Sequence, residues 1–183
     1  MNYFIYIDGL LSLEQHEKWE DVRKLLCRVW GNEKLNCDKA IRLISECWYI
    51  LSEWDSYIDN KNLSYQAFQN TLIECTEFSM QNFKDNARFL CVAGYMISLF
   101  PYLFFVGNAD VLYLEWEQKG IGMLRRAYEL NPNDKVAEIL SLGQTLALSE
   151  YKKIKMSIQN ELTTFFPGET VIERYFRDIL SMH

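Results

Sequence analysis

The stretch ADVLYLEWEQKGIGMLRRAYELNPND, residues 109–134, indicates the class of fold. Its apolar residues recur every three to four positions, which predicts a long helix from about 109 to 130. Pro132 ends this helix, because the residue before a proline is pushed out of the α region. The same period continues over nearly the whole chain, and the sequence therefore predicts an all-α protein.

Seven further helices are expected, which makes about eight in all. They are predicted over residues 13–30, 38–58, 65–83, 86–99, 134–148, 150–165 and 169–181. Only residues 3–7 also fit a short strand, and 8 glycines and 3 prolines leave few turns for a β fold. At 183 residues, the chain is expected to form a single helical domain, residues 1–183.

The sequence contains few residues or motifs that are typical of an enzyme. Its formal net charge of −6 argues against a nucleic-acid partner. His16 and His183 are the only histidines, too few for a histidine-centred triad or zinc site, and phosphate-loop and hydrolase motifs are absent. The acid pair Glu74 and Glu77 shares a helix face, but a solvated surface explains it better than a catalytic dyad. We expect no catalysis, no cofactor and no metal.

The cysteines and the longest uncharged segment point to a cytoplasmic protein. The five cysteines, Cys27, Cys37, Cys47, Cys75 and Cys91, are odd in number and lack C-x-x-C spacing, which favours reduced, mostly buried thiols. The N-terminus does not resemble a signal peptide. Residues 89–106 carry no charge and approach the length of a membrane span, but Pro101 would break such a helix. We interpret this segment as a buried central helix ending near Phe100.

The junction at residues 123–134 resembles part of a tetratricopeptide repeat. MLRRAYELNPND, followed by Ala137 and Leu142-Gly143, matches the end of one repeat and the start of the next, with Gly120 and Ala127 at small positions. Residues 107, 108 and 111 depart from the repeat pattern. The resemblance implies stacked antiparallel helical hairpins, TPR-like, with a core over about residues 65–165. An ordinary helix–proline–helix junction in an unrelated bundle is the alternative.

Acidic residues are concentrated between Glu46 and Asp85, where seven acids accompany two bases. The helix predicted over 38–58 is expected to carry carboxylates and tyrosines on the face opposite its core. Tyrosine is favoured at protein interfaces, and carboxylates orient a basic partner. The residues predicted to bind a partner are Glu46, Tyr49, Glu53, Tyr57, Asp59, Glu74 and Glu77. The alternative is a solvated acidic face whose tyrosines pack against neighbouring helices.

A small acidic domain of this kind suits a stoichiometric inhibitor of a basic nuclease toxin, because its carboxylates can mimic the phosphates of the substrate. In overall character the chain resembles the helical immunity proteins of bacterial contact-dependent growth-inhibition and related polymorphic toxin systems. Residues 94–102, GYMISLFPY, are its most distinctive stretch. The resemblance implies neutralisation of one cognate toxin in the cytoplasm, without nucleic acid or membrane as partner. The alternative is a TPR-like adaptor or chaperone that holds a peptide or helix of a partner protein.

Overall fold

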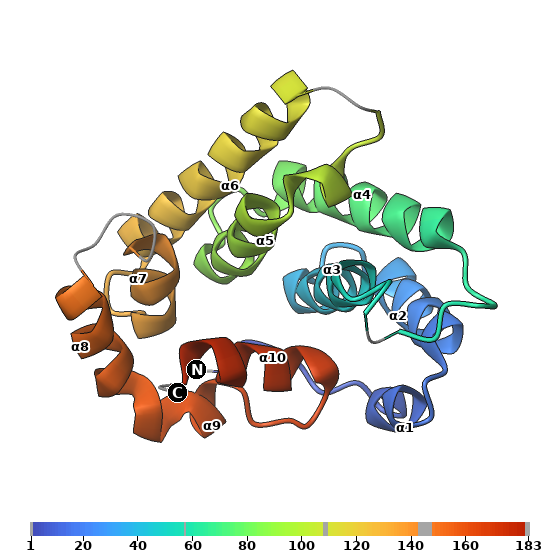
Figure 1. Ribbon diagram of the computed structural model, residues 1–183, viewed down its shortest axis with the longest axis horizontal. Coiled ribbons are helices and arrows are strands. Elements are labelled where there is room, and N and C mark those ends of the chain that lie inside the picture. Colours follow the sequence, from blue (N-terminus) through green and yellow to red (C-terminus); the bar gives the residue numbers. More distant parts are fainter. Residues whose placement is uncertain (1, 57, 108–109, 143–147, 182–183) are drawn as a thin grey trace.

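The computed structural model describes residues 2–56, 58–107, 110–142 and 148–181, and it confirms the all-α prediction (Figure 1). Over these residues the chain forms ten α-helices, two short 3-10 helices and no strand. The α-helices are α1 (Leu10–Gln15), α2 (Trp19–Asn32), α3 (Cys37–Ser52), α4 (Tyr65–Asn82), α5 (Ala87–Leu99), α6 (Asp110–Leu130), α7 (Lys135–Leu142), α8 (Leu148–Ile158), α9 (Leu162–Phe165) and α10 (Val171–Leu180). The 3-10 helices are η1 (Pro101–Phe104) and η2 (Gln159–Glu161).

Helices α4, α5, α6 and α10 begin and end within a few residues of their predicted bounds. The helix predicted over 13–30 is instead two helices, α1 and α2, because Glu17 between them is left-handed, with a φ of 53°. The helix predicted over 38–58 ends at Ser52, where the chain turns. The one predicted over 150–165 is divided into α8, η2 and α9.

Residues 3–7, which also fit a strand, form none and belong to the core instead. Tyr3 and Phe4 are buried. The N–H of Tyr3 donates to the carbonyl of Phe165, at 2.9 Å, and the Phe4 ring lies 5.6 Å from that of Phe176 in α10. The N-terminal segment is therefore held against the C-terminal helices.

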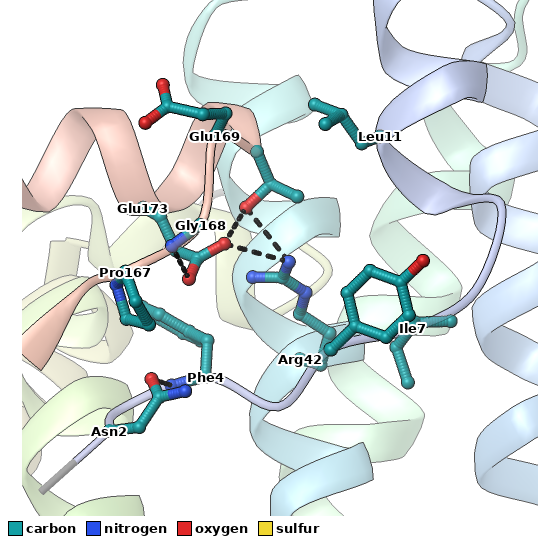
Figure 2. Close-up of a pocket in the computed structure, with 11 residues that line it drawn as sticks. Asn2, Phe4, Ile7, Leu11, Arg42, Pro167, Gly168, Glu169 and Glu173 are labelled. Carbon is teal, nitrogen blue, oxygen red and sulfur yellow. Dashed lines mark hydrogen bonds and ion pairs between the residues drawn. The ribbon is translucent and has the colours of Figure 1, made fainter.

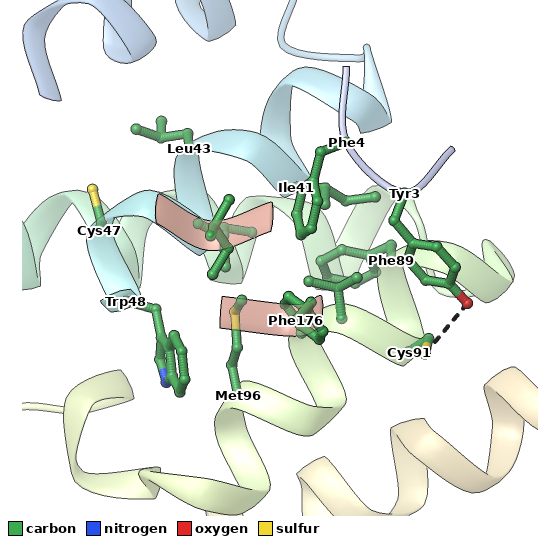
Figure 3. Close-up of a cluster of buried hydrophobic side chains, with 14 of the residues drawn as sticks. Tyr3, Phe4, Ile41, Leu43, Cys47, Trp48, Phe89, Cys91, Met96 and Phe176 are labelled. Carbon is green, nitrogen blue, oxygen red and sulfur yellow. Dashed lines mark hydrogen bonds between the residues drawn. The ribbon is translucent and has the colours of Figure 1, made fainter. Parts of the chain in front are cut away.

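Helix α3 is the centre of the protein. It contacts α2, α4, α5 and α10, and every residue from Ala40 to Trp48 is buried. Figure 3 shows the core around it, where Ile41 and Trp48 lie with Met96 of α5 and Phe176 of α10. The prediction of an exposed outer face is wrong at Glu46, because α10 packs on the helix from a distant part of the chain, whereas Tyr49 and Glu53 are partly exposed.

Helices α5 and α6 form the most extensive helix pair, and they run antiparallel. A Cβ on Gly94 would lie 2.9 Å from the carbonyl oxygen of Gly120, and a Cβ on Gly120 would lie 2.5 Å from the backbone nitrogen of Ser98. The two backbones therefore touch, which only glycine at both positions permits. Helix α5 is buried along most of its length and ends at Leu99, as predicted for the segment before Pro101.

The first half of α6 extends past the end of α5. Gly120 faces Ser98, the next-to-last residue of α5, so residues 110–119 extend about 15 Å beyond this contact. In Figure 1 these yellow turns reach past α5. Among the described residues, η1 packs on these turns, through the ring of Phe104 stacked 6.0 Å from Trp116.

The junction between α6 and α7 has the small buried residues that the repeat resemblance leads one to expect. Gly120 and Ala127 are both buried. Asp134 begins the next helix, and its Oδ1 accepts hydrogen bonds from the N–H groups of Val136 and Ala137 at 3.1 and 3.2 Å. Gly143 lies outside the described residues, and stacking of the tetratricopeptide kind stays a prediction. No helix in the described part of the chain is both long and apolar enough to traverse a lipid bilayer.

The α5–α6 contact can be tested with two alanines in one helix. Gly120→Ala places a methyl group against the backbone of Ser98 and should lower the free energy of unfolding by about 1–3 kcal/mol. Gly122→Ala is the control, because nothing lies within 4 Å of its Cβ position, and it should stabilise by about 0.5–1 kcal/mol. Urea unfolding followed by circular dichroism gives both values. Equal effects of the two substitutions would contradict the contact.

Candidate functional site

The predicted partner-binding residues do not form one surface, and Glu46 is not on the surface at all. Its exposed fraction is 0%. On the sequence it occupies the polar side of an amphipathic helix, but in the structure Glu173 of α10 and Glu14 of α1 lie close to it. The placement of Glu46 on a solvated face is therefore corrected to an interior position.

The predicted residues at the end of α3 are partly buried. The Tyr49 ring packs edge-on against that of Tyr175 in α10, with centroids 6.1 Å apart. Burial raises the pKa of Tyr49, and the neighbouring Glu53 raises it further. Asp59 is exposed in the loop that follows, where its Oδ1 accepts the N–H of Lys61 at 3.4 Å. Tyr57 lies outside the described residues.

Glu74 and Glu77 are exposed and lie at a different place on the molecule. Glu74 is nine residues beyond Tyr65, the first residue of α4, and so about 14 Å along the helix. Its carboxylate lies 3.6 Å from Nζ of Lys34, which follows α2. The predicted site is therefore divided between the loop that joins α3 to α4 and the second half of α4.

The sequence did not reveal a buried charged cluster that joins three helices. Arg42 of α3, Glu14 of α1 and Glu173 of α10 are each less than a tenth exposed. Nη2 of Arg42 lies 3.3 Å from the Glu173 carboxylate and donates to Thr170 Oγ1 at 2.9 Å, and Thr170 donates in turn to Glu173 at 2.5 Å (Figure 2). Nε of Arg42 lies 3.6 Å from Glu46. The Arg42 guanidinium thus pairs with the carboxyl groups of Glu173 and Glu46, and its charge also acts on the carboxyl group of Glu14.

Burial shifts the protonation of this cluster. It raises the pKa of Glu14 to about 7, although the N–H of Val171 and the charge of Arg42 oppose the shift. Burial also raises the pKa of Glu46 well above its usual range, and the nearby Glu14 raises it further. The cause is the low polarity of the interior, which penalises each carboxylate that Arg42 does not neutralise. The folded protein therefore retains protons on these groups at pH values where an unfolded chain releases them.

A cavity of about 280 Å³ lies beside the cluster, between the N-terminal segment and the loop before α10. Figure 2 shows the Arg42 guanidinium among the residues that line it. Its walls are mainly apolar, with Phe4, Ile7 and Pro167 among them. The charged groups at the cavity compensate one another, because Arg42 pairs with Glu173, and Glu169 pairs with Arg177 at 3.1 Å. The cavity is at the small end for a ligand site, and its charged side chains already pair with other side chains of the protein.

Three of the cysteine thiols are packed in the interior of the protein. Cys47, Cys75 and Cys91 are buried, and burial raises the pKa of each thiol, which disfavours the reactive thiolate. Burial raises the pKa of Cys37 to about 11. Within the described ranges, no three histidine, cysteine, aspartate or glutamate side chains are grouped so that they could hold a metal ion.

Comparisons with known proteins give no significant match to a protein-family model, to a curated protein or to a solved structure. The case for a function therefore depends on the surface and the chemistry of the chain itself.

The buried cluster makes the stability of the fold depend on pH. The folded pKa of Glu14 is raised from 4.5 to about 7, so its contribution is fully present below about pH 4.5 and is lost as the pH rises through 7; the pKa of Glu46 is also raised, and its contribution is likewise lost at higher pH. We expect the free energy of unfolding to fall between pH 5 and pH 8. Glu14→Gln keeps an oxygen for the N–H of Val171 and should flatten this fall, whereas the exposed Glu74→Gln should not. Urea unfolding at a series of pH values tests this, and an unchanged slope in Glu14→Gln would contradict it.

Proposed function

We propose that the chain is a stoichiometric protein inhibitor that binds one partner with a basic surface, as an immunity protein binds a cognate nuclease toxin in the bacterial cytoplasm. The observation that carries this proposal is a surface of carboxylates and aromatic rings where α3 leads into α4. We call it the acidic–aromatic face, and its residues are Glu53, Trp54, Asp55, Asp59 and Tyr65.

The acidic–aromatic face combines rigid rings with charges that are available to a partner. The rings of Trp54 and Tyr65 meet edge-on, 5.2 Å apart, and both are partly exposed. Asp55 and Asp59 are exposed, and no cation of the described residues forms an ion pair with either. Aromatic rings supply contact area at little entropic cost, and unpaired carboxylates attract a positive surface. A nuclease has such a surface where it binds phosphates, which is why this partner is proposed.

An adaptor or chaperone is the second candidate. It is favoured by the α6–α7 junction, where Gly120 and Ala127 are buried at the positions expected of a tetratricopeptide repeat. The two candidates differ in their partners. An adaptor binds several short peptides at micromolar strength, whereas an inhibitor binds one folded protein far more tightly.

The first experiment is co-expression with the product of the gene immediately upstream. We expect induction of that product alone to stop growth, co-expression of the chain to restore it, and the two proteins to co-purify as a one-to-one complex. Failure of both rescue and co-purification would contradict the proposal, and binding of several unrelated peptides would favour the adaptor.

Charge reversal tests the electrostatic part of the proposal. Asp55→Lys combined with Asp59→Lys should slow association, most strongly at low salt, and leave the helix content unchanged. Glu161→Lys combined with Asp178→Lys is the matched control, since it changes the net charge equally near the C-terminus. Stopped-flow or surface-plasmon measurements of the association rate at several salt concentrations check it. An equal effect of both pairs would mean that only net charge matters.

A further inference from the structure

Exposed apolar side chains are concentrated in one short segment. Nine large apolar side chains of the described residues are exposed, and six of them lie between residues 99 and 114. We call these six the apolar patch: Leu99, Tyr102, Val106, Val111, Tyr113 and Leu114. The other three, Tyr6, Leu35 and Met156, are far from one another in the sequence. A concentration of exposed apolar side chains in one part of a protein is typical of a protein-binding surface, whereas isolated exposed residues are ordinary.

The position of α6 explains why the apolar side chains on its first turns are exposed to solvent. Val111 and Leu114 are 67% and 58% exposed and lie on the side of the helix opposite Gly120 and Ala127. They belong to the ten residues that extend beyond the contact with α5. Burying apolar side chains is favourable because it removes apolar surface from water, so a partner gains by covering them.

The patch has acidic surroundings and adjoins the acidic–aromatic face. Asp110 and Glu115 are exposed on the same turns of α6 as Val111 and Leu114. Gln69, one turn into α4, donates to the carbonyls of Tyr102 and Phe105 at 3.4 and 3.3 Å. This bond holds η1 against the start of α4, where Tyr65 lies, so the two surfaces are neighbours.

We propose that the apolar patch is the docking centre for the basic partner protein, which covers it with an apolar surface surrounded by lysine or arginine. This inference rests on the proposed function. A second copy of the chain fits less well, because a two-fold interface would place Asp110 and Glu115 near the same carboxylates of the other copy. An anionic membrane surface is disfavoured by the same charges.

The test replaces exposed apolar side chains by serine at two places and measures binding to the co-expressed upstream gene product. Val111→Ser with Leu114→Ser should weaken the complex about tenfold or more, mainly through faster dissociation. Leu35→Ser with Met156→Ser is the control, because it removes comparable exposed apolar surface elsewhere, and it should leave the affinity within about twofold. All four residues are exposed, so the unfolding midpoint should be unchanged in both pairs, which separates lost binding from lost folding.

Each other outcome overturns the inference in a distinct way. If the wild-type chain binds and the patch variant binds equally well, the docking centre lies elsewhere while the proposed function stands. If the isolated chain is a dimer in sedimentation experiments and the patch variant is a monomer, the occupant is a second copy. If the wild-type chain forms no complex, both the proposed function and its docking surface are wrong.

Discussion

The backbone contact between Gly94 and Gly120 positions the second half of the protein and, through it, the proposed docking surface. Two helices can meet at backbone distance only where neither carries a side chain, so this contact fixes how far α6 slides along α5. Pro101 independently limits the length of α5. The two constraints together make α6 longer than the helix that supports it. The exposed turns at residues 110–119 follow from this mismatch in length.

A second constraint holds the outer helices on α3. Arg42 and Glu46 are interior residues because α1 and α10 pack over them, bringing Glu14 and Glu173. A buried ionic cluster is often no more stabilising than apolar residues of the same size, but removing one member leaves the others uncompensated. The cluster therefore favours one arrangement of α1, α3 and α10, and makes the stability of this arrangement sensitive to pH. The buried cluster lies away from the exposed turns of α6. A change in its protonation therefore alters the stability of the fold and leaves those turns unaffected.

The sequence predicted the helices better than their surroundings. Pro101 and Pro132 act on the local backbone, so the helix ends that they set were correctly located. The outer face of α3 was misjudged because Arg42 and Glu46 have the spacing of a solvated stripe. Their partner Glu173 is more than 120 residues away in the chain, and no local pattern indicates that α10 covers them. The apolar patch was missed for a related reason. Val111 and Leu114 lie on the side of α6 opposite Gly120 and Ala127, and no local pattern indicates whether another element of the chain covers that side.

The central claim is that the first half of α6 extends beyond α5 and is supported on one side by η1, whereas the second half is fixed by the glycine contact. Hydrogen–deuterium exchange of the isolated chain, resolved within α6, tests this most directly. We predict that amides at residues 114–119 exchange about 100-fold faster than those at residues 121–130, because the latter lie in the part of the helix that packs along α5. Equal protection of both halves would contradict the claim, since it would mean that the overhanging turns are already covered.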